Sequence, residues 1–237
     1  MKLPCCAIGC LLILYCAFYA WEEGKVQGVI DREGEEFYNK YTIWLKAQGE
    51  RKMLTYHMTI NGVERDLPIC KVNDTLSIGA FVIFGDVELT VAAAEGLLKI
   101  APEYDYLITA EAKGIPLIHE MARQSGQNKY FLARKAAKLY MTGVFETTVR
   151  SITTAKEQHL YLDTADAELM KGKRILVIDD VISTGESLSA IEKLVEEAGG
   201  IVCGRMAILA EGEAAEREDI RFLEKLPLFH PDGTVME

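Results

Sequence analysis

The sequence lacks the motifs of two common nucleotide-binding classes. It contains neither the G-x-x-x-x-G-K-S/T pattern of a P-loop nor the G-x-G-x-x-G pattern of a dinucleotide fold, which disfavours both. Positive charge is also scarce, because 26 lysines and arginines face 36 aspartates and glutamates and the net charge is −10. A nucleic-acid-binding protein would show a basic face instead. Any polyanionic substrate must therefore be held by a local basic cluster.

Cysteine is nearly absent from most of the chain. Four of the six cysteines lie in the first 16 residues, and only Cys70 and Cys203 follow, without a C-x-x-C pair or a metal-binding spacing. This usage is typical of a reduced, cytosolic domain, and we expect both thiols to lie in the core. The 237 residues, 49% of them hydrophobic, suffice for one sizeable core plus an appendage.

Charge is missing altogether from residues 3–21. These 19 residues, if helical, span roughly 28 Å, close to the ~30 Å hydrocarbon core of a bilayer. Basic residues follow the segment, while Lys2 stands alone before it, so the positive-inside rule places the rest of the chain in the cytoplasm. Residues 1–21 are thus either a membrane anchor or a start-site artefact, since Met53 opens the apparent domain. Residues 22–52 read as a linker with an amphipathic helix, and residues 53–237 as the functional domain.

From residue 54 onward, strands are expected to alternate with helices. The chain begins with a hairpin that turns at Asn61-Gly62, and Asp86 then caps a helix. The apolar face of that helix is expected to hold Val87, Val91, Leu97 and Leu98. Further strands are expected at 106–109, 130–133, 174–178 and 201–209, helices at 115–123 and from 188, and a polar helix that contains Ala214 and Ala215. This order predicts an α/β fold, with a parallel sheet, right-handed connections and ligands at the carboxyl ends of the strands.

The segment Arg174–Leu188, RILVIDDVISTGESL, contains the strongest motif. Its apolar run predicts a strand buried on both faces of a parallel sheet. The following small-residue loop opens a helix, and the free N–H groups and the helix dipole make such a loop an anion site. The adjacent Asp179 and Asp180 are acceptors suited to a vicinal diol or to the water shell of a metal. A phosphate on the loop and a diol on the acids describe a ribose 5-phosphate. The loop residues are Ser183, Thr184, Gly185, Glu186 and Ser187.

Two further loops are expected at the same edge of the sheet. The first offers a glycine-bearing turn with one cation, and the second holds the densest basic cluster in this acidic protein. We interpret the two loops as a seat for a diphosphate, although solvated surface lysines are the alternative. The residues are Glu111, Ala112, Lys113 and Gly114 in the first loop, and Arg134, Lys135 and Lys138 in the second.

These three segments together resemble a known family. Residues 175–187 resemble the phosphoribosyl diphosphate (PRPP) signature of type I phosphoribosyltransferases. The stretch ITAEAKGIPL resembles the I-E-A-R-G loop of the adenine phosphoribosyltransferases, with Lys113 in place of arginine. The stretch FLARKAAKLY resembles their R-K-x-G-K-L segment, with Ala137 where glycine is usual. Similar segments occur in xanthine phosphoribosyltransferases and in the purine repressor of Gram-positive bacteria. The resemblance covers residues 53 to the C-terminus.

The resemblance implies a five-stranded parallel sheet with flanking helices, a small hood, a flexible loop and a homodimer. It implies transfer of ribose 5-phosphate from PRPP to a purine, with Mg²⁺ bound alongside PRPP at Asp179 and Asp180. The flexible loop is expected at residues 140–163, where Glu146 or Glu157 could serve as the general base. Glu186 departs from the family, because many members carry glycine there.

The identity of the base rests on two weaker features. Glu211 ends the strand at 201–209, where relatives that use 6-oxopurines often present a lysine, and an ionised carboxylate accepts from the amino group of adenine. The alternative is that Glu211 merely faces solvent. The hood at 67–85, with Phe81, is expected to wall the ring, although a core role is equally compatible. Adenine is therefore the expected base, with a xanthine or hypoxanthine enzyme and a PRPP-sensing regulator as alternatives.

Overall fold

The computed structural model describes residues 54–236 except 151–156. The chain divides into two units, residues 1–52 and 53–237. The predicted membrane segment and linker helix therefore lie outside the described residues. Among the residues that are described, no helix is long and apolar enough to cross a membrane.

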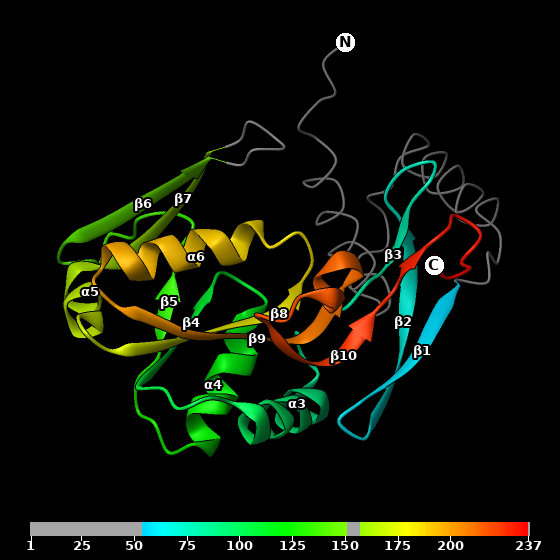
Figure 1. Ribbon diagram of the computed structural model, residues 1–237, viewed down its shortest axis with the longest axis horizontal. Coiled ribbons are helices and arrows are strands. Elements are labelled where there is room, and N and C mark those ends of the chain that lie inside the picture. Colours follow the sequence, from blue (N-terminus) through cyan, green and yellow to red (C-terminus); the bar gives the residue numbers. More distant parts are fainter. Residues whose placement is uncertain (1–53, 151–156, 237) are drawn as a thin grey trace, which may run out of the picture. The chain divides into compact units, whose positions relative to one another are not determined.

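A five-stranded parallel sheet forms the centre of the second unit (Figure 1). Its order is β10-β9-β8-β4-β5, and every neighbouring pair is parallel. The predicted fold class is confirmed. The strands are β4 (Tyr106–Ala110), β5 (Phe131–Ala133), β8 (Arg174–Ile182), β9 (Ile201–Glu211) and β10 (Arg221–Leu226).

Helices cover both faces of this sheet (Figure 1). One core contains Leu176 and Ile178 of β8 together with residues of α3 and α4, while Ile175 and Val177 belong to a second core with α6. Successive side chains of a strand point to opposite faces, which explains why the central strand is apolar throughout. The helices are α3 (Val87–Ile100), α4 (Gly114–Gln124), α5 (Thr164–Met170) and α6 (Glu186–Glu197), with a 3₁₀ turn, η1 (Gly212–Glu216).

A second, antiparallel sheet forms the hood, in the order β1-β2-β3-β11. The predicted hairpin is confirmed, and both turn residues, Asn61 and Gly62, have positive φ, as a tight two-residue turn requires. The strands are β1 (Thr55–Ile60), β2 (Val63–Lys71), β3 (Ser77–Gly79) and β11 (Leu228–Phe229). The C-terminal strand β11 thus completes the hood.

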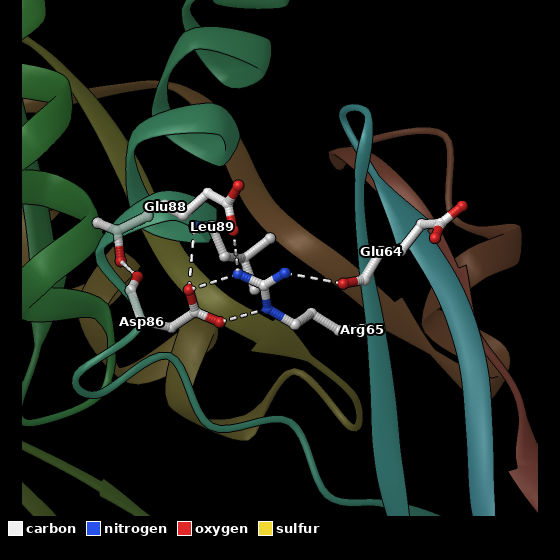
Figure 2. Close-up of polar contacts among 6 residues, drawn as sticks. Glu64, Arg65, Asp86, Glu88 and Leu89 are labelled. Atoms are coloured by element: carbon white, nitrogen blue, oxygen red, sulfur yellow. Dashed lines mark hydrogen bonds and ion pairs between the residues drawn. The ribbon is translucent and has the colours of Figure 1, made fainter.

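Arg65 of β2 ties the hood to the start of α3 (Figure 2). Its guanidinium donates two hydrogen bonds to Asp86, of 2.7 and 2.8 Å, and one of 2.8 Å to Glu88. Asp86 also accepts from the backbone N–H of Leu89, which confirms the predicted helix cap. The hydrogen bonds from Arg65 hold the pKa of Asp86 below its usual value. These ion pairs hold β2 of the hood against the N-terminus of α3.

The segment predicted as a flexible loop contains a hairpin of β6 (Val144–Arg150) and β7 (Glu157–Asp163). The hairpin lies along α6 (Figure 1), where Lys193 donates to the carbonyl of Thr148 and Thr147 bonds Glu197. Its other end reaches the predicted diphosphate loop, because Arg134 and Tyr161 exchange two backbone hydrogen bonds of 2.9 Å. The hairpin is therefore attached to both the helix and the basic loop.

Several local predictions were wrong. The polar helix expected at 214–215 is a short 3₁₀ turn, and β10 was not predicted because its sequence lacks a clear apolar run. Cys70 is exposed rather than in the core, and Cys203 is only partly buried. Val87 and Val91 are 73% and 39% exposed, because the buried face of α3 consists of Leu89, Thr90, Ala93, Ala94, Gly96 and Leu97 instead.

Candidate functional site

The carboxyl end of β8 holds the paired acids and leads into the phosphate loop. Asp180 is buried, and its backbone N–H donates to Asp179 Oδ1 at 2.9 Å. Gly185 has a φ of 79° and caps α6, a conformation that glycine adopts without the steric cost of a side chain. The backbone N–H of Ser189 donates to the carbonyl of Gly185. The helix therefore starts directly behind the loop, and its dipole places positive potential there.

Lys113 connects the first predicted diphosphate loop to the acids. Its Nζ lies 2.6 Å from Asp180 Oδ2, and that oxygen accepts no well-directed hydrogen bond from the described residues. Burial, followed by the neighbouring charge of Asp180, raises the pKa of Asp179, and the positive charge of Lys113 opposes this rise. The lysine therefore offsets part of the cost of burying two adjacent carboxylates.

Glu111 connects the first loop to the second. Its Oε1 lies 2.7 Å from Arg134 Nε and 3.9 Å from Lys138 Nζ. Its Oε2 accepts from the backbone N–H of Lys135 at 2.8 Å, and its own N–H donates to the carbonyl of Ala133. The predicted basic cluster is thus gathered around one carboxylate. The peptide bond between Glu111 and Ala112 is cis.

Gly114 allows the first loop to close tightly over β4. A Cβ at this position would stand 2.2 Å from Thr109 Oγ1, a side chain that is fully buried. Only glycine permits this approach, and α4 begins immediately at Gly114. Lys113 is thereby fixed at the helix N-cap, at the edge of the sheet where β8 ends.

The two predicted purine contacts, Glu211 and Phe81, lie in different environments. Glu211 is half-buried at the end of β9, and burial raises its pKa while the charge of Lys113 opposes the rise. Glu211 therefore lies within electrostatic reach of the loops. Phe81 is 5% exposed and packs in the core with Met58 and Ile83, which fits the core alternative. Phe84, three residues later, is exposed.

The two candidate general bases lie on the β6–β7 hairpin. Glu146 Oε1 accepts from the hydroxyl of Tyr161 at 3.2 Å and lies 2.8 Å from His159 Nδ1. The side chain of Glu157 lies outside the described residues.

Arg217 lies beside the 183–187 loop and is not among the residues predicted from the sequence. It follows η1, and its Nη1 lies 2.7 Å from where a Cβ on Gly185 would stand. Its Nε and Nη2 both donate to Asp219, at 2.9 and 2.7 Å. No sequence motif marks Arg217. It comes close to the loop only in the folded chain, after the chain has left β9.

Residues 87–226 match the phosphoribosyl transferase domain family. A hypoxanthine/guanine phosphoribosyltransferase from Methanococcus voltae is 30% identical over 151 residues, which cover 61% of this chain and 76% of that protein. An adenine phosphoribosyltransferase from Rhodococcus jostii is 30% identical over 146 residues, with coverages of 62% and 78%. The chain therefore belongs to the phosphoribosyltransferase family, and the resemblance seen in the three loops is confirmed.

Solved structures share the fold. Adenine phosphoribosyltransferase from Thermoanaerobacter pseudethanolicus matches with a TM-score of 0.52 at 20% identity, over 74% of this chain and 98% of that one. The Rhodothermus marinus enzyme of the same name gives a TM-score of 0.52 at 20% identity, with coverages of 73% and 94%. At these identities the match shows the type I fold alone.

Proposed function

We propose that the protein is a purine phosphoribosyltransferase that transfers ribose 5-phosphate from PRPP to adenine, giving AMP and diphosphate. One observation carries the proposal. Three loops from β4, β5 and β8 meet at one edge of the sheet, linked by the Lys113–Asp180 and Arg134–Glu111 contacts. The arrangement offers an anion site, a pair of acids and a basic cluster next to one another, which matches the phosphate, the diol and the diphosphate of PRPP.

The reaction displaces diphosphate from C1 of the ribose through a transition state with positive charge on the sugar. Positioning and electrostatics supply most of the catalysis in such a displacement. The 183–187 loop anchors the 5-phosphate. Asp179 and Asp180 hold the ribose hydroxyls and place negative potential beside the developing cation.

The basic cluster stabilises the leaving group. Arg134 and the Lys135 backbone are oriented by Glu111 before any ligand arrives, so little reorganisation accompanies the reaction. Lys113 contacts both Asp180 and the incoming diphosphate. It therefore lies between the developing positive charge on the sugar and the negative charge on the leaving diphosphate. Losing one such preorganised contact typically costs about 3–4 kcal/mol at the transition state.

The donor set fits a substrate-borne Mg²⁺. Among the described residues there is no group of three or more acidic, histidine or cysteine side chains that could hold a metal alone. Mg²⁺ is commonly bound by one or two carboxylates together with substrate phosphates, and Asp179 and Asp180 offer such a pair. Bound there with PRPP, the ion would neutralise negative charge on the departing diphosphate.

Adenine is proposed as the base because of Glu211. As an ionised carboxylate it accepts a hydrogen bond from an exocyclic amino group but donates none to a carbonyl. A hypoxanthine/guanine preference is the second candidate, favoured by the Methanococcus voltae relative.

Diphosphate release separates these candidates. We expect the full-length protein with PRPP to release diphosphate with adenine and far less with hypoxanthine, guanine or xanthine. A preference for a 6-oxopurine would establish the second candidate, and no release with any base would favour a PRPP-sensing regulator. Asp180→Asn should abolish release while the circular dichroism spectrum is unchanged. Normal activity in this variant would remove the acids from the mechanism.

Two further proposals concern the state of the protein in the cell. We propose a homodimer, as in the family resemblance, and light scattering of the purified chain measures it directly. We also propose a cytoplasmic location, with residues 3–21 as an anchor on the inner face of the membrane. Carbonate-resistant recovery in the membrane fraction supports the anchor, whereas a fully soluble chain that begins at residue 53 argues for the start-site artefact.

A further inference from the structure

The side chain of Arg217 packs directly against the phosphate loop. Its Nη1 stands 2.7 Å from the position that a Cβ on Gly185 would occupy. Gly185 caps α6 and lies in the middle of the 183–187 loop. A guanidinium nitrogen therefore lies beside the backbone of the loop that the proposed function assigns to the 5-phosphate.

Asp219 holds Arg217 in this position. Nε and Nη2 of Arg217 donate to the two carboxylate oxygens of Asp219, at 2.9 and 2.7 Å. This paired geometry fixes the plane of the guanidinium. Arg205 of β9 lies near the same carboxylate, with its Nε 3.7 Å from Asp219 Oδ2, and it also bonds Glu192 of α6.

One nitrogen of Arg217 remains for a ligand. In the part of the chain that the structure describes, Nη1 donates no hydrogen bond, although Nε and Nη2 are both engaged. The side chain is 36% exposed, so solvent and ligands reach it. A fixed planar cation with a free edge is a common partner for phosphate oxygens.

The helix dipole and the backbone N–H groups at the start of α6 favour an anion on the same loop, next to this guanidinium. We propose that Arg217, held by Asp219, is a further binding residue for the 5-phosphate. This inference rests on the proposed function, since it assumes a sugar phosphate on the 183–187 loop.

Calorimetric titration of the full-length protein tests the proposal with two probes, ribose 5-phosphate and inorganic diphosphate. A hydrogen bond between charged groups contributes strongly to binding affinity. Arg217→Met should therefore weaken the binding of ribose 5-phosphate about 10- to 100-fold. The binding of diphosphate should be unchanged, because that ligand occupies the basic cluster. Asp219→Asn should give a smaller loss of ribose 5-phosphate affinity, since the guanidinium of Arg217 remains but its orientation is no longer fixed by a carboxylate.

The matched control is Arg221→Met. Arg221 is an arginine of β10 whose Nη1 bonds the carbonyl of Ile100, so its loss should leave both ligands unaffected. Unchanged ribose 5-phosphate binding in Arg217→Met overturns the proposal. An equal loss for both probes does so too, because it indicates general damage to the site. If Arg217→Met does not fold, Arg217→Lys takes its place and should show a partial loss.

Failure of the proposed function would look different. A wild-type protein that binds ribose 5-phosphate but releases no diphosphate with any purine refutes the enzyme assignment while leaving the role of Arg217 intact. A wild-type protein that does not bind ribose 5-phosphate overturns the Arg217 proposal itself.

Discussion

Replacing Lys113 with methionine tests the electrostatic link between the first loop and the acids. The change keeps the length of the side chain and removes the ammonium that lies 2.6 Å from Asp180 Oδ2. Breaking a fully buried ion pair costs about 3–5 kcal/mol, because one charge is left buried without a partner. Asp180 is 5% exposed but Lys113 is 45% exposed, so water already screens part of the attraction. We therefore expect Lys113→Met to lower the free energy of unfolding by about 1–3 kcal/mol at neutral pH.

The loss should depend on pH with a defined sign. Burial raises the pKa of Asp179 above its unfolded value, and Lys113 opposes the rise. The folded protein thus binds more protons than the unfolded chain between the ordinary carboxylate pKa and the raised one, and its stability falls as pH increases through this window. Removing Lys113 raises the pKa of Asp179 further. The difference between variant and wild type should therefore be largest at pH 8 and smaller at pH 5.

Urea unfolding at these two pH values measures the effect, and two variants control it. Lys113→Arg keeps the positive charge and should stay close to the wild type. Asp180→Asn removes one of the paired carboxylates, so adding Lys113→Met to it should cost much less than Lys113→Met alone. An equal loss at pH 5 and pH 8, or a full loss in the Asp180→Asn background, would refute the electrostatic explanation.

The remaining predictions concern the other loops. Glu111→Gln should weaken diphosphate binding about tenfold, because Arg134 loses the carboxylate that orients it; calorimetry with inorganic diphosphate checks this, and unchanged affinity contradicts it. Gly185→Ala should destabilise the protein by about 1–2 kcal/mol, since its φ of 79° disfavours a side chain and the new Cβ meets Arg217; an unaltered urea midpoint would be incompatible with that strain. Glu211→Lys should shift the preference from adenine toward hypoxanthine, because a lysine donates to a carbonyl; diphosphate release with each base measures it, and an unchanged preference removes Glu211 from base recognition.

The elements that sequence predicts best are those whose signal is local. The apolar run before Asp179 is visible because both faces of β8 are buried. Asp86 predicts the start of α3, because a cap residue bonds backbone groups within the first turn of its helix. The turn at Asn61 and Gly62 is equally local, since it depends on the φ angles of the two residues themselves. Each of these predictions is confirmed.

The features that sequence misses depend on contacts between distant segments. β10 lies at an edge of the sheet, and its strand RFLEKL is only partly buried, so it shows no apolar run. Cys70 is exposed because β2 presents it away from the core, which composition cannot reveal. Arg217 meets Gly185 across a gap of 32 positions in the chain. The basic loop was predicted. Glu111, whose carboxylate organises that loop, was predicted to contact the diphosphate and was not recognised as a counter-ion.

Built-in counter-ions explain how so acidic a protein can receive a polyanion. Three cations at the site already have a carboxylate partner: Lys113 with Asp180, Arg134 with Glu111, and Arg217 with Asp219. The partners hold the cations in place and reduce the side-chain entropy that is lost when an anion binds. In the proposed function, a lone phosphate engages one of these pairs, whereas a ligand with phosphates at both ends of a sugar engages all three at once, which favours PRPP over simple anions.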